Sequence, residues 1–449
     1  MTTLGISMIV RDAAKLLPNC LASIRDLAAE TRIADTGSSD DTIAVATKFG
    51  ACVISIPWTN DFAAARNLAL AGLHTDWVLS LDADERLDST VAELLPPLLE
   101  NPSIAGYQVT IRNYVLSLQD RVWDRAAKLN DQLLPSGSRY PGYVEHENVR
   151  LFRRDPSIYF VGRVHESVGS SILESGRTLG AANFFIHHFG LAMDEETRAR
   201  KNRFYRELGR EKIREMPNNA QAHLELGLVE MDNFGNLPEA QKLFERACAL
   251  NPRFGLAWFF LGVVLIKLDR ATAALKALDE AERLGHRTSL VAEFRGDAHY
   301  NLGSFPRAAD CYETALRRDP VSPQLESKLG LSVVRCGNMS RGIHRLQRAV
   351  ATQPGTPELH DRLVTTLVWL GRLEDAACAA ETKLQAIEKP APGDYLRAAS
   401  LWAKSKDWNR AVARLEQGLQ KFPSSTELQR GLDEALLATA IPRMANATK

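Results

Sequence analysis

The stretch "DWVLSLDADERLD", residues 76–88, contains a short apolar run that ends abruptly in acidic side chains. The run has the composition of a buried strand, and Asp82, Asp84 and Glu85 follow it. Closely spaced carboxylates at the end of a strand can present oxygen ligands to Mg²⁺ or Mn²⁺. Short acidic turns are also common on protein surfaces, so this segment alone favours a solvated turn. Sequence features elsewhere in the chain are needed to decide between a metal site and a solvated turn.

The composition indicates a globular protein with more than one domain. The chain has 449 residues, which is more than one hydrophobic core usually fills. Apolar residues make up 45% and charged residues 24%, as in chains that fold throughout. Lys plus Arg equal Asp plus Glu at 55 each, so the chain has no overall basic field that would attract nucleic acid or anionic lipid.

The cysteines and the apolar runs predict a cytoplasmic protein without a membrane span. The six cysteines are scattered and form no CxxC pair, which favours free thiols in a reducing compartment. Arg11 and Asp12 interrupt the first apolar run, which is too short for a signal sequence. No later run approaches the ~20 apolar residues that a membrane-spanning helix needs.

The first half of the chain alternates short apolar runs with amphipathic stretches, which predicts an α/β domain. Strands separated by helices favour a parallel sheet with helices on both of its faces. After residue 104 the strand-like runs become longer and predict an antiparallel portion that completes the sheet. The expected strands are 4–10, 31–37, 51–57 and 76–82 in the parallel portion, and 104–115, 148–154, 158–168 and 182–190 in the added portion.

Polar clusters follow three of the expected parallel strands. They are Arg11–Asp12, Asp35 with the residues after it, and Asp82–Asp84. Ligands of open α/β sheets bind beyond the carboxyl ends of the strands. We therefore expect these clusters to converge at one edge of the sheet.

The second half of the chain is a repeat. Ala240, Ala274 and Ala308 are 34 residues apart. Gly303, Gly337 and Gly371 have the same spacing, and each is expected at the turn between two helices. Helix pairs with this period and with small residues at the helix contacts are typical of tetratricopeptide repeats. About six units fit into residues 219–423, followed by an end helix. The predicted domains are an α/β domain at 1–190, a charged connecting helix at 191–218, a repeat domain at 219–440 and a tail at 441–449.

The order of the sequence blocks in the first half closely resembles the family 2 glycosyltransferases of GT-A fold, especially the subgroup with carboxy-terminal tetratricopeptide (TPR) repeats. The resemblance spans nearly the whole α/β domain at 1–190 and implies that this is a catalytic domain. It rests on "ISMIVRD" (6–12), "ADTGSSDDT" (34–42), "WTNDFAAARN" (58–67), "LSLDADE" (79–85), "RLFRR" with "GRVHESV" (150–168) and "HHFG" (187–190).

The resemblance implies that the domain binds a nucleotide-diphosphate sugar, in particular a UDP-sugar. By position, Val10 and Arg11 would border the nucleobase, and Asp35 would accept a hydrogen bond from the base or the ribose. Arg66 and Asn67 would face the donor.

The same resemblance implies a site for Mn²⁺ or Mg²⁺. Asp84 would ligate the metal directly, Asp82 would approach the ribose or the metal, and His188 would be the third protein ligand. The adjacent His187 would point to the opposite face of its strand.

Relatives of this kind usually invert the anomeric centre, which requires a general base to deprotonate the acceptor. Glu166 is the candidate base, because it follows a strand-like run and lies in a family block. His165 would orient Glu166 or contact the diphosphate. Glu145 and Glu147 are the reserve candidates.

The acceptor and the donor base stay open. Tetratricopeptide arrays hold extended peptides or helices, which favours a peptide or protein acceptor, although the array could instead form a homodimer interface. Arg11-Asp12-Ala13 stands where the family usually has Lys-Asn-Glu. A non-catalytic adaptor with a degenerate nucleotide-binding domain is therefore the alternative. A nucleotidyltransferase is less favoured, because no glycine-rich phosphate loop follows the first strand.

Overall fold

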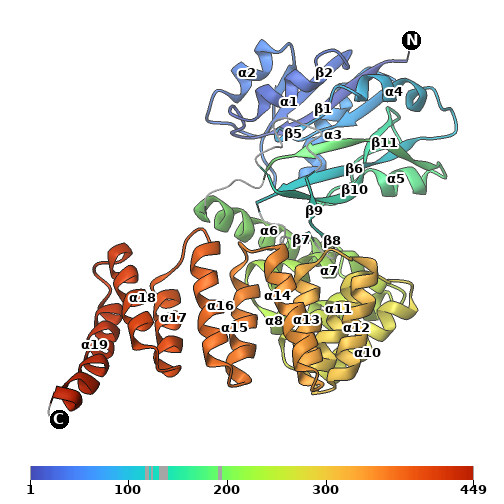
Figure 1. The fold of residues 1–449 in the computed structure, drawn as a ribbon. Helices are drawn as coiled ribbons and strands as arrows, with labels where there is room; N and C mark the ends of the chain where they lie inside the picture. The colour runs from blue at the N-terminus through green and yellow to red at the C-terminus, as the bar shows by residue number, and fades with distance from the viewer. Residues whose placement is uncertain (1, 117–120, 123–124, 131–139, 191–194, 448–449) are drawn as a thin grey trace. The chain divides into compact units, whose positions relative to one another are not determined.

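The computed structural model describes residues 2–116, 121–122, 125–130, 140–190 and 195–447. The chain divides into two compact units, Met1–Leu250 and Asn251–Lys449, which are described separately below (Figure 1).

The first unit is built on a mixed sheet whose strand order is β3-β2-β1-β4-β10-β6-β11-β5, with β9 paired to β10. Neighbouring strands among β1 to β4 run parallel, whereas β10 runs antiparallel to both β4 and β6. Two further short strands, β7 and β8, pair with each other. The strands are β1 Leu4–Val10, β2 Glu30–Asp35, β3 Cys52–Ser55, β4 Trp77–Ser80, β5 Glu85–Arg86, β6 Gly106–Val115, β7 Arg121–Val122, β8 Arg125–Ala126, β9 Lys128–Leu129, β10 Gly142–Arg153 and β11 Leu179–His188.

Helices cover both faces of this sheet, as predicted. Side chains alternate along β4, so that Trp77 and Leu79 join one buried cluster and Val78 joins another. The first cluster includes residues of helices α1 and α4, and the second includes residues of α3 and α5. The helices are α1 Leu17–Ile24, α2 Thr42–Lys48, α3 Phe62–Ala71, α4 Val91–Leu99 and α5 Gly169–Glu174.

The strands expected in the first hundred residues are confirmed in β1 to β4, and three of the four later runs lie in β6, β10 and β11. The added portion is not wholly antiparallel, because β11 runs parallel to β6. The strand predicted at 158–168 is wrong. Gly162 and His165 have positive φ angles of 101° and 53°, which turn the chain into a loop that a single bridge between Val161 and Ser167 closes.

The expected charged helix after the sheet is α6, Glu195–Glu215. It is followed in the same unit by α7 (Ala220–Leu228), a π-helical turn η2 (Val229–Asn233) and α8 (Leu237–Leu250). The first helix pair of the repeat therefore clusters with the sheet domain. The predicted domain bounds remain a prediction.

The second unit consists of antiparallel helix pairs stacked in sequence order and a long final helix (Figure 1). Gly303, Gly337 and Gly371, which the period placed at turns, have φ angles of 72°, 91° and 73° that favour glycine. The predicted fold class, an α/β domain followed by an all-α repeat array, is confirmed. The helices are α9 Gly255–Lys267, α10 Ala271–Arg283, α11 Ser289–Asn301, α12 Phe305–Arg318, α13 Pro323–Arg335, α14 Met339–Thr352, α15 Pro357–Trp369, α16 Leu373–Ala386, α17 Pro392–Lys404, α18 Trp408–Lys421 and α19 Thr426–Ala447.

All six cysteines carry free thiols. Within the described ranges, no helix combines the length and the apolar character that crossing a bilayer requires.

Small residues allow the helices of a repeat to approach closely. A substitution at Gly296 can test this role. A Cβ atom added at Gly296 of α11 would lie 2.5 Å from the ring of Tyr312 on α12. We expect Gly296→Ala to destabilise the repeat unit by about 1–3 kcal/mol, because overpacking forces helices or rings apart. Gly393→Ala is the matched control, because Gly393 lies in α17 with no atom near the added Cβ. Thermal unfolding followed at the helical circular-dichroism band should show a lower midpoint for Gly296→Ala alone.

Candidate functional site

The carboxyl ends of the parallel strands meet at one edge of the sheet, where the sequence placed its polar clusters. Val10, the last residue of β1, lies opposite Asp35, the last residue of β2. On its other side, Ser7 of β1 lies opposite Ser80, the last residue of β4. Asp82 therefore enters the site from the neighbouring strand end.

A buried arginine organises this edge. The Nη2 atom of Arg66, on α3, donates to Asp82 Oδ1 at 2.6 Å, and its Nε atom donates to Glu166 Oε1 at 2.5 Å. Only 7% of the Arg66 side chain is exposed. Burial lowers the pKa of the guanidinium, but the two carboxylates raise it by more. The pKa of Arg66 therefore lies above its ordinary value. Arg66 is thus a fixed positive charge between two acids.

A second arginine, Arg150 of β10, occupies the other side of Asp82. Its Nη2 atom lies 3.3 Å from Asp82 Oδ2 and 2.8 Å from Glu85 Oε1. Although burial tends to raise the pKa of Asp82, Arg66 and Arg150 hold it well below its usual range. Each carboxylate oxygen of Asp82 accepts from one arginine, and its role toward the ribose or the metal remains a prediction.

Glu85 closes the acidic turn on the protein side. It is 1% exposed, and its Oε2 atom accepts from the backbone N–H of Asp82 at 2.8 Å. Burial and the negative charge of Asp82 raise the pKa of Glu85, and the positive charge of Arg150 lowers it. The net result is a pKa of about 7. Glu85 is therefore held between the backbone of Asp82 and Arg150, where it shapes the turn that presents Asp84.

Asp84 and His188 come together as the resemblance implied. His188, at the end of β11, lies with its Nε2 atom 3.2 Å from Asp84 Oδ2. Its Nδ1 atom lies 2.7 Å from Oδ1 of Asn113, on the adjacent strand β6. Burial lowers the pKa of His188, but the hydrogen bond to Asp84 and the surrounding acids raise it by more, so the net shift is upward.

Asn113 sets the tautomer of His188. The Nδ2 atom of Asn113 donates to the carbonyl of Val144 at 3.0 Å, which places its Oδ1 atom toward His188. An amide oxygen only accepts, so Nδ1 of His188 must carry a proton. In the neutral ring the lone pair of Nε2 then faces Asp84. Two acceptors this close need a proton or a cation between them.

These residues fit a divalent cation with two protein ligands. Two ligands at about 2.1 Å from a cation and roughly at right angles lie about 3 Å apart, close to the observed separation. A Cβ atom at Gly190 would lie 2.1 Å from Asp84 Oδ2 and 2.7 Å from His188 Nε2, so a side chain there would fill the space between them. In the described part of the chain, no three His, Cys, Asp or Glu side chains form a metal-binding group. Water and donor oxygens would have to complete the coordination.

His187 points away from this site. It is fully buried, its ring stacks on Tyr114 at a centroid distance of 5.9 Å, and its Nε2 atom lies 3.5 Å from Asp88. The adjacent histidines thus make separate His–Asp pairs on the two faces of β11.

The residues predicted to contact the nucleotide lie at the same sheet edge. The carboxylate of Asp35 accepts from the backbone N–H groups of Gly37 and Ser38, both at 3.0 Å, and so shapes the turn after β2. Val10 ends β1, and more than half of the Arg11 side chain is exposed beyond it. Their roles toward a donor remain predictions.

Asn67 and His165 have structural partners of their own. The amide of Asn67 donates to Phe160 O at 3.0 Å and accepts from Phe160 N at 2.8 Å, which holds the chain leading into the loop at 161–167. His165 packs on Tyr205, with ring centroids 6.3 Å apart. Their predicted contacts with the donor are untested.

The sequence did not single out Arg150 or Asn113. Arg150 opens the "RLFRR" block, but nothing local shows that it lies between two acids.

The two reserve candidates for the general base differ in their surroundings. Glu145 pairs with Arg112 at 3.1 Å, whereas Glu147 lies on β10 opposite Thr110.

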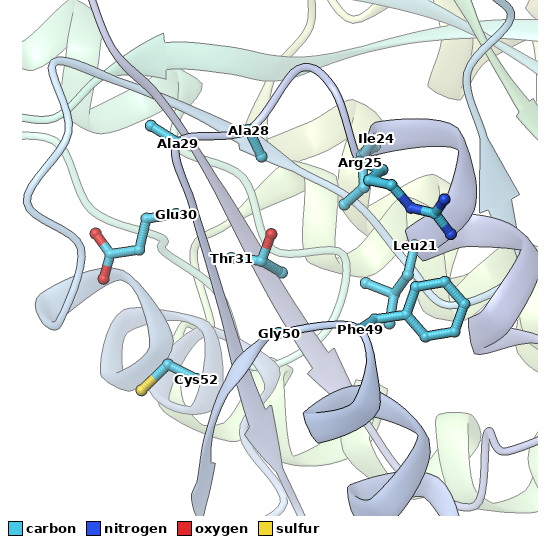
Figure 2. Close-up of a pocket in the computed structure, with 10 residues that line it drawn as sticks. All are labelled: Leu21, Ile24, Arg25, Ala28, Ala29, Glu30, Thr31, Phe49, Gly50 and Cys52. Carbon is cyan, nitrogen blue, oxygen red and sulfur yellow. The ribbon is translucent and has the colours of Figure 1, made fainter.

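A separate pocket of about 230 Å³ lies at the amino-terminal edge of β2 and β3 (Figure 2). Arg25 and Phe49 lie on one side of it, and Glu30 and Cys52 on the other (Figure 2). None of its lining residues belongs to the predicted site, which is at the opposite ends of the parallel strands.

Comparison with known proteins identifies both parts of the chain. Residues 6–158 match the family described as glycosyl transferase family 2, and residues 232–285 and 295–339 match tetratricopeptide repeats. The chain therefore carries a family 2 glycosyltransferase domain, an enzyme domain, followed by tetratricopeptide repeats.

The chain is similar to several known proteins over part or most of its length. A TPR repeat-containing protein of Synechococcus elongatus is 28% identical over 409 residues, which are 87% of this chain and 94% of that protein. The lipopolysaccharide core biosynthesis glycosyltransferase LpsC of Rhizobium meliloti is 31% identical over 188 residues, which are 40% of this chain and 61%, less than two thirds, of LpsC. A tetratricopeptide repeat protein from Parabacteroides merdae superposes with a TM-score of 0.41 and 13% identity, covering 54% of this chain and 94% of that one.

Asp84 and Asp88 form a matched pair for testing the cation site, since each pairs with one of two adjacent histidines. We expect Asp84→Asn to weaken Mn²⁺ binding in the presence of UDP by about 100-fold or more, because a charged ligand is lost. Asp88→Asn should leave it unchanged. Isothermal titration calorimetry measures both, and equal affinities in the two variants would refute the site.

The burial of Arg66 predicts a large effect on stability. Arg66→Met should destabilise the first unit by about 3–5 kcal/mol, because Glu166 loses a buried partner and Asp82 loses one of two. Arg177→Met breaks a half-exposed pair with Asp155 and should cost less than about 1 kcal/mol. Hydrogen exchange of the β1 and β4 amides reports the difference.

Proposed function

We propose that this protein transfers a sugar from a nucleotide-diphosphate donor, in particular a UDP-sugar, to a peptide or protein acceptor, with inversion at the anomeric carbon. The observation that carries the proposal is the convergence of Asp84, His188, Arg66 and Glu166 from four separate segments at the carboxyl edge of the sheet. Binding sites of open α/β sheets lie at this edge.

Asp84 and His188 would hold Mn²⁺ or Mg²⁺ together with donor oxygens. The bound ion would neutralise the diphosphate as it leaves the sugar. Asn113 keeps a proton on Nδ1 of His188, and so leaves Nε2 free to act as a ligand. Glu85 and Arg150 hold the acidic turn in place from the protein side.

Glu166 is the proposed general base. One of its oxygens, Oε1, accepts from Arg66, which fixes the orientation of the carboxylate. No hydrogen bond to Oε2 is found among the described residues, so this oxygen is free to take the proton of an acceptor hydroxyl or thiol. The side chain is 12% exposed, which is enough for a bound acceptor to reach it.

The repeat array supports a peptide or protein acceptor, because stacked helix pairs present extended surfaces that bind peptides. We also propose a cytoplasmic location, which the free cysteines support. Labelled-sugar transfer to peptide libraries and to free saccharides compares the acceptor classes directly. Transfer confined to saccharides would refute the peptide acceptor.

The proposal predicts that the full chain releases UDP from at least one UDP-sugar in the presence of Mn²⁺. Glu166→Gln should keep UDP binding and lower turnover by about 10²–10⁴-fold, because glutamine still accepts from Arg66 but cannot take a proton. UDP release and calorimetric binding are measured on the same samples.

Two outcomes would count against this assignment. Full turnover in Glu166→Gln would remove Glu166 as the base. An absence of both Mn²⁺-dependent UDP binding and UDP release in the wild-type chain would favour the adaptor alternative.

A further inference from the structure

The proposed base lies in a loop that needs outside support. Residues 161–167 are closed by two backbone hydrogen bonds between Val161 and Ser167, of 3.0 and 3.2 Å. His165, directly before Glu166, has a φ angle of 53°, a conformation that costs a non-glycine residue roughly 1–3 kcal/mol. Such a conformation persists only where the surroundings hold it.

Helix α6 supplies that support through a buried lysine. Lys212 Nζ donates to the carbonyl oxygen of Val164 at 2.8 Å and to Glu225 Oε2, on α7, at 2.7 Å. Lys212 is 6% exposed and Glu225 is 8% exposed. A buried ammonium group is costly unless it is paired, so the pair with Glu225 fixes where the Nζ atom can lie. The carbonyl it binds is two residues before Glu166.

A second contact joins the same loop to the end of α6. Arg163 Nε donates to Glu215 Oε1 at 2.7 Å, and Arg163 Nη1 donates to the carbonyl of Asn60 at 3.3 Å. The backbone N–H of Phe62, at the start of α3, donates to the carbonyl of Arg163 at 3.0 Å. The loop is therefore held between α6 and the helix that carries Arg66.

An aromatic contact places α6 beside the site itself. The ring of Tyr205 stacks on Phe62 at a centroid distance of 5.9 Å and lies 6.3 Å from the ring of His165. Burial raises the pKa of Tyr205 to about 12, and the charges of Glu166 and Asp82 add to the shift. Tyr205 is thus within electrostatic range of the acids at the sheet edge.

We propose that α6 and the first helix pair of the repeat are part of the catalytic unit, and that the Lys212–Glu225 pair is a positioning element that holds Glu166 against Arg66. This inference rests on the proposed function in that it takes Glu166 as the base. Neither Lys212 nor Glu225 contacts the reacting atoms. The first repeat pair then serves the chemistry, and its contribution does not depend on any acceptor that the later repeats bind.

A neighbouring ion pair provides a matched control. Arg206, also on α6, donates to both oxygens of Glu230 at 2.7 and 2.8 Å, and Glu230 is fully buried in η2. This pair likewise joins α6 to the first repeat pair. Among the described residues it has no hydrogen bond or ion pair with the loop at 161–167.

The test compares two double variants of the full chain, Lys212→Met with Glu225→Leu and Arg206→Met with Glu230→Leu. Replacing both partners leaves no buried unpaired charge, so each variant can fold. We expect the first to lower kcat by about tenfold or more, because a base displaced by about 1 Å loses its alignment, and to keep the Kd for UDP with Mn²⁺ within twofold. The second should keep kcat within twofold of wild type.

Hydrogen exchange separates this inference from the proposed function, because it needs no turnover. The amides of Val161 and Ser167 should exchange at least tenfold faster in the Lys212 and Glu225 variant than in the Arg206 and Glu230 variant. Equal exchange in the two variants, or equal loss of kcat, would overturn the positioning role. If no UDP-sugar is turned over by the wild-type chain, the exchange measurement still decides. The double variant Lys212→Met with Glu225→Gln, which also leaves no buried unpaired charge, serves if the first double variant does not fold.

Discussion

The candidate site depends on one buried guanidinium group. Arg66 is almost fully buried, and such a charge is tolerated inside a protein only with close, hydrogen-bonded partners. Its two partners, Asp82 and Glu166, come from the turn after β4 and from the loop at 161–167. The need to neutralise Arg66 therefore fixes the distance between the acidic turn and the proposed base. Arg150 repeats the same arrangement on the other side of Asp82.

The mixed sheet makes this arrangement possible. The parallel strands bring their carboxyl ends to one edge, and β10, inserted antiparallel between β4 and β6, carries Arg150 to the back of the acidic turn. Strand β5 pairs with β11, so that His188 lies opposite Glu85 and beside Asp84. Backbone register thus sets the spacing of the acids and the histidine.

The division of the chain into units has a functional consequence. Because α6, α7 and α8 cluster with the sheet domain, the first helix pair of the repeat lies in the same compact unit as the candidate site. The buried Lys212–Glu225 pair and the partly buried Arg206–Glu230 pair join α6 to this first pair. Of these two pairs, Lys212–Glu225 also binds the loop at 161–167 through the carbonyl of Val164, so its loss is the one expected to affect catalysis.

Sequence alone determined the features that depend on neighbouring residues or on a fixed period. Strands β1 to β4 follow from short apolar runs between amphipathic helices, and the repeat array follows from small residues 34 positions apart. Asp84 and His188 were found by their resemblance to family blocks, and the structure brings them together.

Tertiary structure decided the contacts between residues far apart in the chain. Asp82 and Arg150 are 68 positions apart, and Arg66 and Glu166 are 100 apart, so no local pattern shows that these charges meet. The same applies to the loop at 161–167, whose apolar alternation predicted a strand, whereas positive φ angles and the buried Lys212 hold it as a loop. Local periodicity reports backbone preference, but the position of a buried charge depends on which partner the whole fold brings within hydrogen-bonding distance.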